Sequence, residues 1–209
     1  MTRFLTLRAV VATALLAAGA PAATISFTGA FDFDNDVALQ SFTVPVDGVV
    51  HLISLGGSGG VNADAATIPS GGFDTVLTLY SAAGDFIDFN DDGATVALDP
   101  LTGLPVDAEL ELFLVAGDYQ FAVTQYDNYP VGDLISGFLY DFDSNFTAFS
   151  GCPAGEFCDF DGNDRSREWA VDLTLPEAMT AIPEPGALPL LAAGLAATAW
   201  LRRRPGHSR

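Results

Sequence analysis

Short runs of alternating apolar and polar residues, separated by Gly, Asp, Asn and Pro, dominate residues 24–181. Because successive side chains point to opposite faces of a strand, such runs predict half-buried β-strands rather than amphipathic helices. In 109–115, for example, the leucines at even positions would face a core, and the glutamates at odd positions would face solvent.

We expect strands at 24–30, 38–46, 49–55, 74–81, 85–89, 109–115, 119–125 and 135–141, and a late one around Trp169. About nine short strands without crossover helices favour an all-β fold, an antiparallel β-sandwich of jelly-roll-like size. The short Gly-containing loop 116–118 predicts a β-hairpin between the strands on either side of it.

The charge of the chain is distributed unevenly. There is no lysine, and residues 24–181 hold 26 of the 27 Asp and Glu but only two of the eight arginines, a charge of −24 within a total of −19. A body of this charge excludes nucleic-acid binding, which needs clustered Lys and Arg, and argues against an anionic membrane surface as a partner. With 49% apolar residues and 16 Phe, the body should nevertheless fold.

The N-terminus has the pattern of a secretory signal peptide over residues 1–23. Arg3 and Arg8 form a short basic start, an apolar run follows, and Ala20-Pro21-Ala22 fits a small-residue cleavage site. The alternative is a buried N-terminal helix. We expect an exported protein whose acidic domain spans residues 24–181.

The C-terminal residues 182–209 carry a second apolar run, 187–201. As a helix this run would be about 22 Å long, which is a marginal length for crossing a membrane. It follows Pro183-Glu184-Pro185, contains Pro189, and precedes Arg202-Arg203-Arg204. These three elements in this order resemble the PEP-CTERM sorting signal of exported bacterial proteins. The resemblance implies that an exosortase-type membrane protease recognises the motif and removes the helix and arginines. The alternative is a permanent tail anchor.

Two long segments interrupt the strand pattern. Residues 56–72 form a Gly-rich loop, and residues 141–167 form an acidic excursion that contains both cysteines. In an exported protein, Cys152 and Cys158 are most simply a disulfide, and we expect it to order the excursion. A zinc site is not expected, since two thiolates need two further ligands and His51 lies far away in a strand pattern.

The acidic residues gather in turns, and carboxylate, Asn and backbone oxygens are the ligands that Ca²⁺ prefers. One group follows the first strand, a second surrounds strand 85–89, and a third lies beside the cysteines. The candidate ligands are Asp34, Asp36, Asp74, Asn90, Asp91 and Asp92, and, as a weaker set, Asp159, Asp161 and Asn163. The weaker set opens like an EF-hand loop but has Ala170 where a bidentate Glu is required. The alternative is that these side chains only shape turns and solvate the surface.

Several of these segments resemble the bacterial pre-peptidase C-terminal domain, a secreted β-sandwich of which some members bind calcium. The resemblance rests on residues 74–93 (DTVLTLYSAAGDFIDFNDDG), 114–119, 122–124 and the acidic stretch 31–43. A group of PEP-CTERM proteins built on this sandwich is similar over most of the body, through Gly71–Asp74, Gln125–Asn128 and Trp169. The resemblance implies that Asp74, Asn90, Asp91 and Asp92 approach Asp34 and Asp36 at one end of the sandwich. The region 130–167 has no counterpart in the family.

Catalysis is not expected. The body has one histidine, no G-x-S-x-G motif and no nucleophile motif, and the glycines at 56–60 do not precede a helix as a phosphate loop requires. Among 26 acids, close carboxylate pairs arise by chance and do not indicate a glycosidase.

Two functions remain. The first is a non-catalytic protein of the cell surface or extracellular matrix, for which the PEP-CTERM resemblance implies a link to exopolysaccharide and only transient membrane anchoring. The alternative is a carbohydrate-binding module that uses exposed aromatic residues near the Gln125–Asn128 turn, with Tyr126, Tyr129, Phe138 and Tyr140 as candidates. Such aromatics can equally belong to the core.

Overall fold

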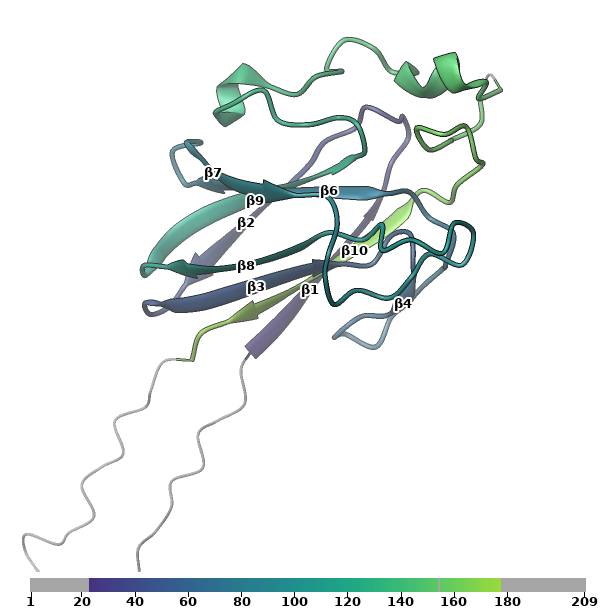
Figure 1. The fold of residues 1–209 in the computed structure, drawn as a ribbon. Coiled ribbons are helices and arrows are strands. Elements are labelled where there is room, and N and C mark those ends of the chain that lie inside the picture. Colours follow the sequence, from purple (N-terminus) through teal and green to yellow (C-terminus); the bar gives the residue numbers. More distant parts are fainter. Residues whose placement is uncertain (1–22, 154, 178–209) are drawn as a thin grey trace, which may run out of the picture. The chain divides into compact units, whose positions relative to one another are not determined.

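The computed structural model describes residues 23–153 and 155–177, which lie in one compact unit, Pro21–Ala178. Two four-stranded antiparallel sheets pack face to face (Figure 1). The first sheet has the order β1 (Ala23–Ala30), β10 (Glu168–Leu175), β3 (Gly48–Ser54), β8 (Glu109–Leu114). The second has the order β2 (Ala38–Val44), β9 (Gly117–Gln125), β6 (Thr75–Ser81), β7 (Phe86–Asn90). The predicted β-sandwich is confirmed.

The core lies between the two sheets and is built from the period-two pattern of their strands. In β8, Leu110 and Leu114 are buried whereas Phe113 is 65% exposed. In β9, Phe121 and Val123 face the same interior. The alternation predicted from the sequence therefore identifies the core-facing residues of β8 and β9 correctly.

The predicted hairpin between 109–115 and 119–125 is wrong. β8 pairs with β3 in the first sheet, and β9 pairs with β2 and β6 in the second. Both strands carry an apolar face, and placing them in opposite sheets lets these faces meet across the core instead of side by side. The crossing is fixed by the Tyr119 hydroxyl, which donates to the carbonyl of Val115 (3.0 Å), and by Asp47, which accepts from the amide of Ala116 (2.8 Å).

The predicted strand at 135–141 is also wrong. This segment holds the 3₁₀ turn η1 (Leu134–Ser136) and irregular chain, and a second turn, η2 (Phe146–Ser150), follows. Figure 1 shows both turns above the outer face of the second sheet. Phe138 packs there against Tyr80 and Ala122, so β6 is buried on both faces. The apolar residues of 135–141 thus belong to a covering layer and not to a strand.

The Gly-rich segment 56–72 is ordered and contains the two-residue strands β4 (Gly60–Val61) and β5 (Thr67–Ile68). Its first residues wrap the fully buried carboxylate of Asp107, which accepts from the amides of Gly56, Gly57 and Ser58 and from the Ser58 hydroxyl. A Cβ on Gly57 would lie 2.1 Å from Val106 Cγ2, so glycine is needed for this close approach. The loop is an anion nest for an internal carboxylate.

The predicted disulfide between Cys152 and Cys158 is confirmed, with the two Cα atoms 5.8 Å apart. The loop that it closes packs onto the sandwich. Gln125 donates its side-chain amide to the carbonyl of Cys158 (2.6 Å), and Phe157 packs against Phe73 with ring centroids 5.6 Å apart.

Replacing both cysteines by serine should lower the free energy of unfolding by about 2 kcal/mol, because a small loop is released in the unfolded chain. Urea unfolding of residues 21–178, oxidised and reduced, measures this difference. The reduced protein should match the double variant, and identical midpoints for the oxidised and reduced protein would show that the disulfide contributes nothing.

Candidate functional site

Asp74 is the centre of the acidic residues that the sequence singled out. It directly precedes β6, and its Oδ1 atom is buried without a hydrogen-bond partner. Burial, and then the negative charges of Asp92, Asp91 and Asp107, raise the pKa of Asp74 to about 8, against a smaller opposing effect of Arg165. Asp91 and Asp92 therefore lie close enough to Asp74 to raise its pKa.

Asn90 takes a supporting position beside them. Its side-chain amide donates to the carbonyl of Glu109 (2.8 Å), and its Oδ1 accepts from the amide of Asp92 (3.2 Å). Asp91 accepts a short hydrogen bond from the Tyr129 hydroxyl. We call Asp74, Asp91 and Asp92 the Asp74 group.

Asp34 and Asp36 have other partners. Asp34 is buried, and its Oδ2 accepts from the amide (2.9 Å) and the hydroxyl (2.8 Å) of Thr147 in η2. Asp36 accepts from the amides of Asp32 and Phe33 and so closes its own turn. In residues 23–153 and 155–177, neither carboxylate shares a hydrogen-bond partner with the Asp74 group.

The weaker set of predicted ligands lies next to Asp74. Asp159 accepts from the amides of Asp161 (3.0 Å) and Asn163 (2.8 Å) and from the Asn163 side chain. A cavity of about 60 Å³ is lined by Asp74, Asp159 and Asp161 together with Tyr126, Phe160 and Arg165. Two acidic groups that are 85 residues apart in the chain thus meet at one small cavity.

Among the residues that the structure describes, no group of three or more His, Cys, Asp or Glu side chains is arranged to hold a metal ion. His51, the histidine of the body, pairs with Glu109 at 2.9 Å. A calcium ion at the Asp74 group would therefore also need backbone or Asn oxygens, and the calcium site stays a prediction.

An ion-pair cluster that the sequence did not reveal borders the same cavity. The buried Arg165 pairs through Nη1 with Asp99 (2.9 Å) and through Nε with Asp159 (2.6 Å), and it donates to the carbonyl of Gly72 (3.2 Å). Burial alone would raise the pKa of Asp99, but hydrogen bonds from Thr102 and Arg165 outweigh it and lower that pKa. Arg165 therefore holds three distant segments together.

Six aromatic rings form a continuous row beside the Asp74 group, exposed at both ends and half-buried in the middle. Successive ring centroids are 4.8 to 6.2 Å apart, and most neighbouring rings meet edge to face. The row consists, in order, of Phe86, Phe89, Tyr129, Tyr126, Phe160 and Phe149. We call these six residues the aromatic row. Phe89 is 42% and Phe149 is 67% exposed.

The predicted glycan contacts Tyr126 and Tyr129 are central members of this row. Tyr126 is fixed by its amide, which donates to the carbonyl of Asp74 (2.9 Å). Burial, and then the hydrogen bond to Asp91, raise the pKa of Tyr129, which keeps its hydroxyl protonated. The other two candidates are placed differently, because Phe138 is buried and Tyr140 stacks on Phe146 at 4.2 Å. Those two residues support the covering layer.

The sequence indicated only part of this row. Phe160 lies within the acidic loop 159–164, and Phe89 ends the predicted strand 85–89 directly before the acidic turn 90–93. An exposed Phe at such a position is a usable signal, but only the fold shows that residues 86–89, 126–129 and 149–160 meet.

The sorting residues Pro183, Glu184, Pro185, Arg202, Arg203 and Arg204, the apolar run 187–201 and the signal segment up to residue 22 lie outside the described residues. In the part that is described, the structure has no helix that is long and apolar enough to cross a membrane.

The pKa of Asp74 predicts a measurable pH effect in the presence of a chelator. The folded-state pKa of about 8 lies above the ordinary value of 3.8, so between these values the folded protein holds a proton that the unfolded chain releases. Stability should therefore fall as the pH rises through this window, by at most about 1.4 kcal/mol per pH unit from this group.

Asp74→Asn should remove this part of the pH dependence and be more stable than the original protein at alkaline pH. Urea unfolding of both proteins across the window measures the difference, and other titrating groups are common to both. Parallel stability profiles would show that Asp74 titrates normally.

No protein-family model matches the chain, and no curated protein matches it. Solved structures similar to it include the pre-peptidase C-terminal domain of collagenase from Bacillus anthracis, at 9% identity and a TM-score of 0.37 over 72% of this chain and 88% of that one. Another is a protein from Sulfurospirillum deleyianum, at 9% identity and a TM-score of 0.35 over 76% of this chain and 100% of that one.

Proposed function

We propose that the protein is a non-catalytic, exported β-sandwich protein of the cell surface or extracellular matrix. The signal-like N-terminus and the PEP-CTERM-like tail support export and sorting by an exosortase. The roles of the buried carboxylates support a structural domain, because Asp99, Asp107 and Asp159 each hold loops through several hydrogen bonds.

Cell fractionation tests the sorting. When the full chain is expressed, the processed protein should be recovered outside the cell or in the matrix, whereas a variant with Pro183→Ala and Pro185→Ala should stay with the membrane. These residues lie outside the sandwich domain, so the variant should fold normally. Equal fractionation of the two proteins would remove the sorting proposal.

The aromatic row favours a second, compatible function, which is binding of an extracellular polysaccharide. A pyranose ring has an apolar C–H face that packs on aromatic rings, and its hydroxyl groups bond to carboxylates. Here six rings lie in sequence beside Asp91 and the other acids of the Asp74 group. Phe86, Phe89 and Phe149 of the row are exposed to solvent, where a ligand could contact them. The polysaccharide would lie along the row and need no catalytic group.

Calcium at the Asp74 group is a further part of the proposal. The support is a partnerless buried carboxylate oxygen of Asp74, two more carboxylates near it, and a cavity of about 60 Å³. Calcium at 100 times its dissociation constant should stabilise the domain by about 2.7 kcal/mol.

Thermal unfolding of residues 21–178 with millimolar calcium and then with a chelator measures this shift. Asp74→Asn should lose it, whereas Asp88→Asn, an exposed carboxylate on β7, should keep it. An unchanged unfolding midpoint of the original protein would reject the proposed calcium site.

A further inference from the structure

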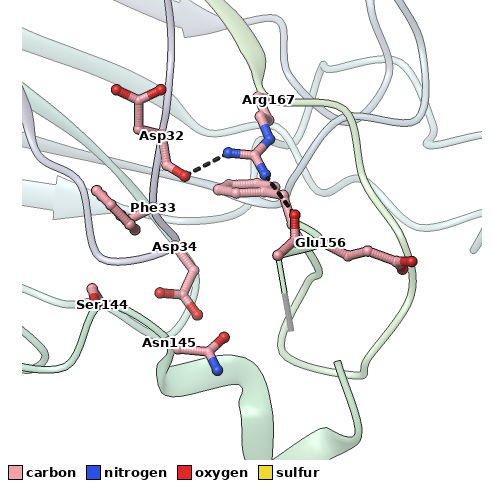
Figure 2. A pocket seen from close by; sticks show the side chains of 9 residues that line it. Asp32, Phe33, Asp34, Ser144, Asn145, Glu156 and Arg167 are labelled. Atoms are coloured by element: carbon pink, nitrogen blue, oxygen red, sulfur yellow. Dashed lines mark hydrogen bonds between the residues drawn. The ribbon is translucent and has the colours of Figure 1, made fainter. Parts of the chain in front are cut away.

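A second and larger cavity lies where the β1–β2 loop meets the start of η2. Its volume is about 380 Å³, enough for a sugar unit, and Asp34, Asn145, Phe157 and Arg167 contribute to its lining. Figure 2 shows the carboxylate of Asp34 and the amide of Asn145 pointing into this space, whereas the carboxylate of Glu156 points away from it. None of the proposed functions above involves this cavity.

Asp34 is the unusual residue of this cavity. Asp34 is only 4% exposed, and its Oδ1 atom is buried without a hydrogen-bond partner. The other oxygen accepts two hydrogen bonds from Thr147, and both come from neutral groups. A buried carboxylate with an unused oxygen and no cationic partner costs free energy, which a ligand carrying a charged donor would recover.

Arg167 lines the same cavity, but its guanidinium does not pair with the Asp34 carboxylate. Arg167 donates to the carbonyl of Asp32, as Figure 2 shows, and also to the carbonyl of Gly155, and its guanidinium lies 5.2 Å from the ring centroid of Phe157. In the described part of the chain, the ion pairs are those of His51 and Arg165, so Asp34 is not paired with Arg167. Arg167 is therefore free of an ion pair with Asp34, and its guanidinium can donate hydrogen bonds to the hydroxyl oxygens of a ligand in the cavity.

These groups suit a ligand that carries a positive charge at one position and hydroxyl groups at others. We propose that the cavity binds an amino sugar, a hexosamine unit whose amine is not acetylated. The ammonium group would pair with the Asp34 carboxylate, and the hydroxyls would bond to Asn145 and Arg167. A body charge of −24 also favours a cationic polysaccharide over a neutral or acidic one.

This inference rests on the proposed polysaccharide binding and names the class of sugar. The two sites adjoin the same turn, because Asn145 directly precedes η2 and Phe149 of the aromatic row lies within it. One polysaccharide chain with free amino groups could contact both.

Titration of residues 21–178 with glucosamine, N-acetylglucosamine and glucose, followed by amide NMR at about pH 6, tests the inference. Glucosamine should shift the Asn145 side-chain and Arg167 signals and bind at least about tenfold more tightly than the other two sugars, as expected when a charged hydrogen bond is lost. Asp34→Asn keeps acceptors for Thr147 and should abolish the preference for glucosamine. Asp64→Asn, which removes the same charge from an exposed loop, should keep it.

Equal binding of the three sugars, or full glucosamine binding by Asp34→Asn, would overturn the inference. If Asp34→Asn does not fold, Asn145→Ala on the exposed rim replaces it and should weaken glucosamine binding. Shifts confined to Tyr126, Tyr129 and Phe160 would place the sugar on the aromatic row, which contradicts the cavity but keeps polysaccharide binding. Absence of any sugar or polysaccharide binding would reject both.

Discussion

Arg165→Met should destabilise the domain by about 3–5 kcal/mol, because it leaves two buried carboxylates without their counter-charge. The guanidinium is almost completely buried, and both Asp99 and Asp159 pair with it. Neither acid has another cationic partner among the described residues. Urea unfolding of residues 21–178 measures the loss.

Two control variants separate charge from packing. Arg167→Met removes a half-exposed arginine that donates to backbone carbonyls and should cost much less, about 1 kcal/mol. Adding Asp99→Asn and Asp159→Asn to Arg165→Met removes the uncompensated charges and should restore part of the stability. If Arg165→Met alone stays within about 1 kcal/mol of the original protein, the ion-pair cluster does not hold the loops.

Asp107→Ala should cost a similar amount, about 3–5 kcal/mol, for a different reason. The carboxylate is fully buried, and its removal leaves the amides of Gly56, Gly57 and Ser58 without their acceptor. Each unsatisfied buried donor costs about 1–3 kcal/mol, partly offset when water enters the space. Chemical denaturation measures the total, and hydrogen exchange should show faster exchange at these three amides.

Asp118→Ala is the matched control for Asp107→Ala. Asp118 accepts one hydrogen bond from Thr43 at the exposed end of β9, so its loss should change stability by less than about 1 kcal/mol. Unchanged exchange at residues 56–58 in Asp107→Ala would contradict the anion-nest description.

The sandwich was predictable because its strands obey a local rule. The period-two alternation of apolar and polar residues lies within the sequence of each strand, and it identified β8 and β9 and their inner faces. Which strands pair is a property of the whole chain. The connection through Val115 and Ala116 is as short as a hairpin loop, yet it crosses between the sheets.

The covering layer shows a second limit. Residues 135–141 have the apolar content of a strand, but they pack their side chains on a sheet without joining its hydrogen bonds. Periodicity reports which residues are buried and not whether the backbone pairs. The pairing of Cys152 with Cys158 was predictable because the body has no other cysteine.

The candidate site was predictable in its residue types and not in its assembly. Turn-localised acids and the Gln125–Asn128 segment indicated Asp74, Asp91, Tyr126 and Tyr129. The roles of Asp107 and Arg165 depend on long-range contacts to residues 56–58 and to Asp99, which no local pattern encodes. Likewise, Phe149 and Phe160 join the row only because the excursion folds back.

Affinity measurements on a polysaccharide array test most directly the proposal that the aromatic row binds polysaccharide. Residues 21–178 should bind at least one polysaccharide, and Tyr126→Ala and Phe89→Ala should each weaken that binding about tenfold or more. Phe113→Ala removes an aromatic residue that is 65% exposed on β8, away from the row, and should bind normally. If the folded domain binds no polysaccharide, or if both row variants bind as tightly as the original protein, the claim is wrong.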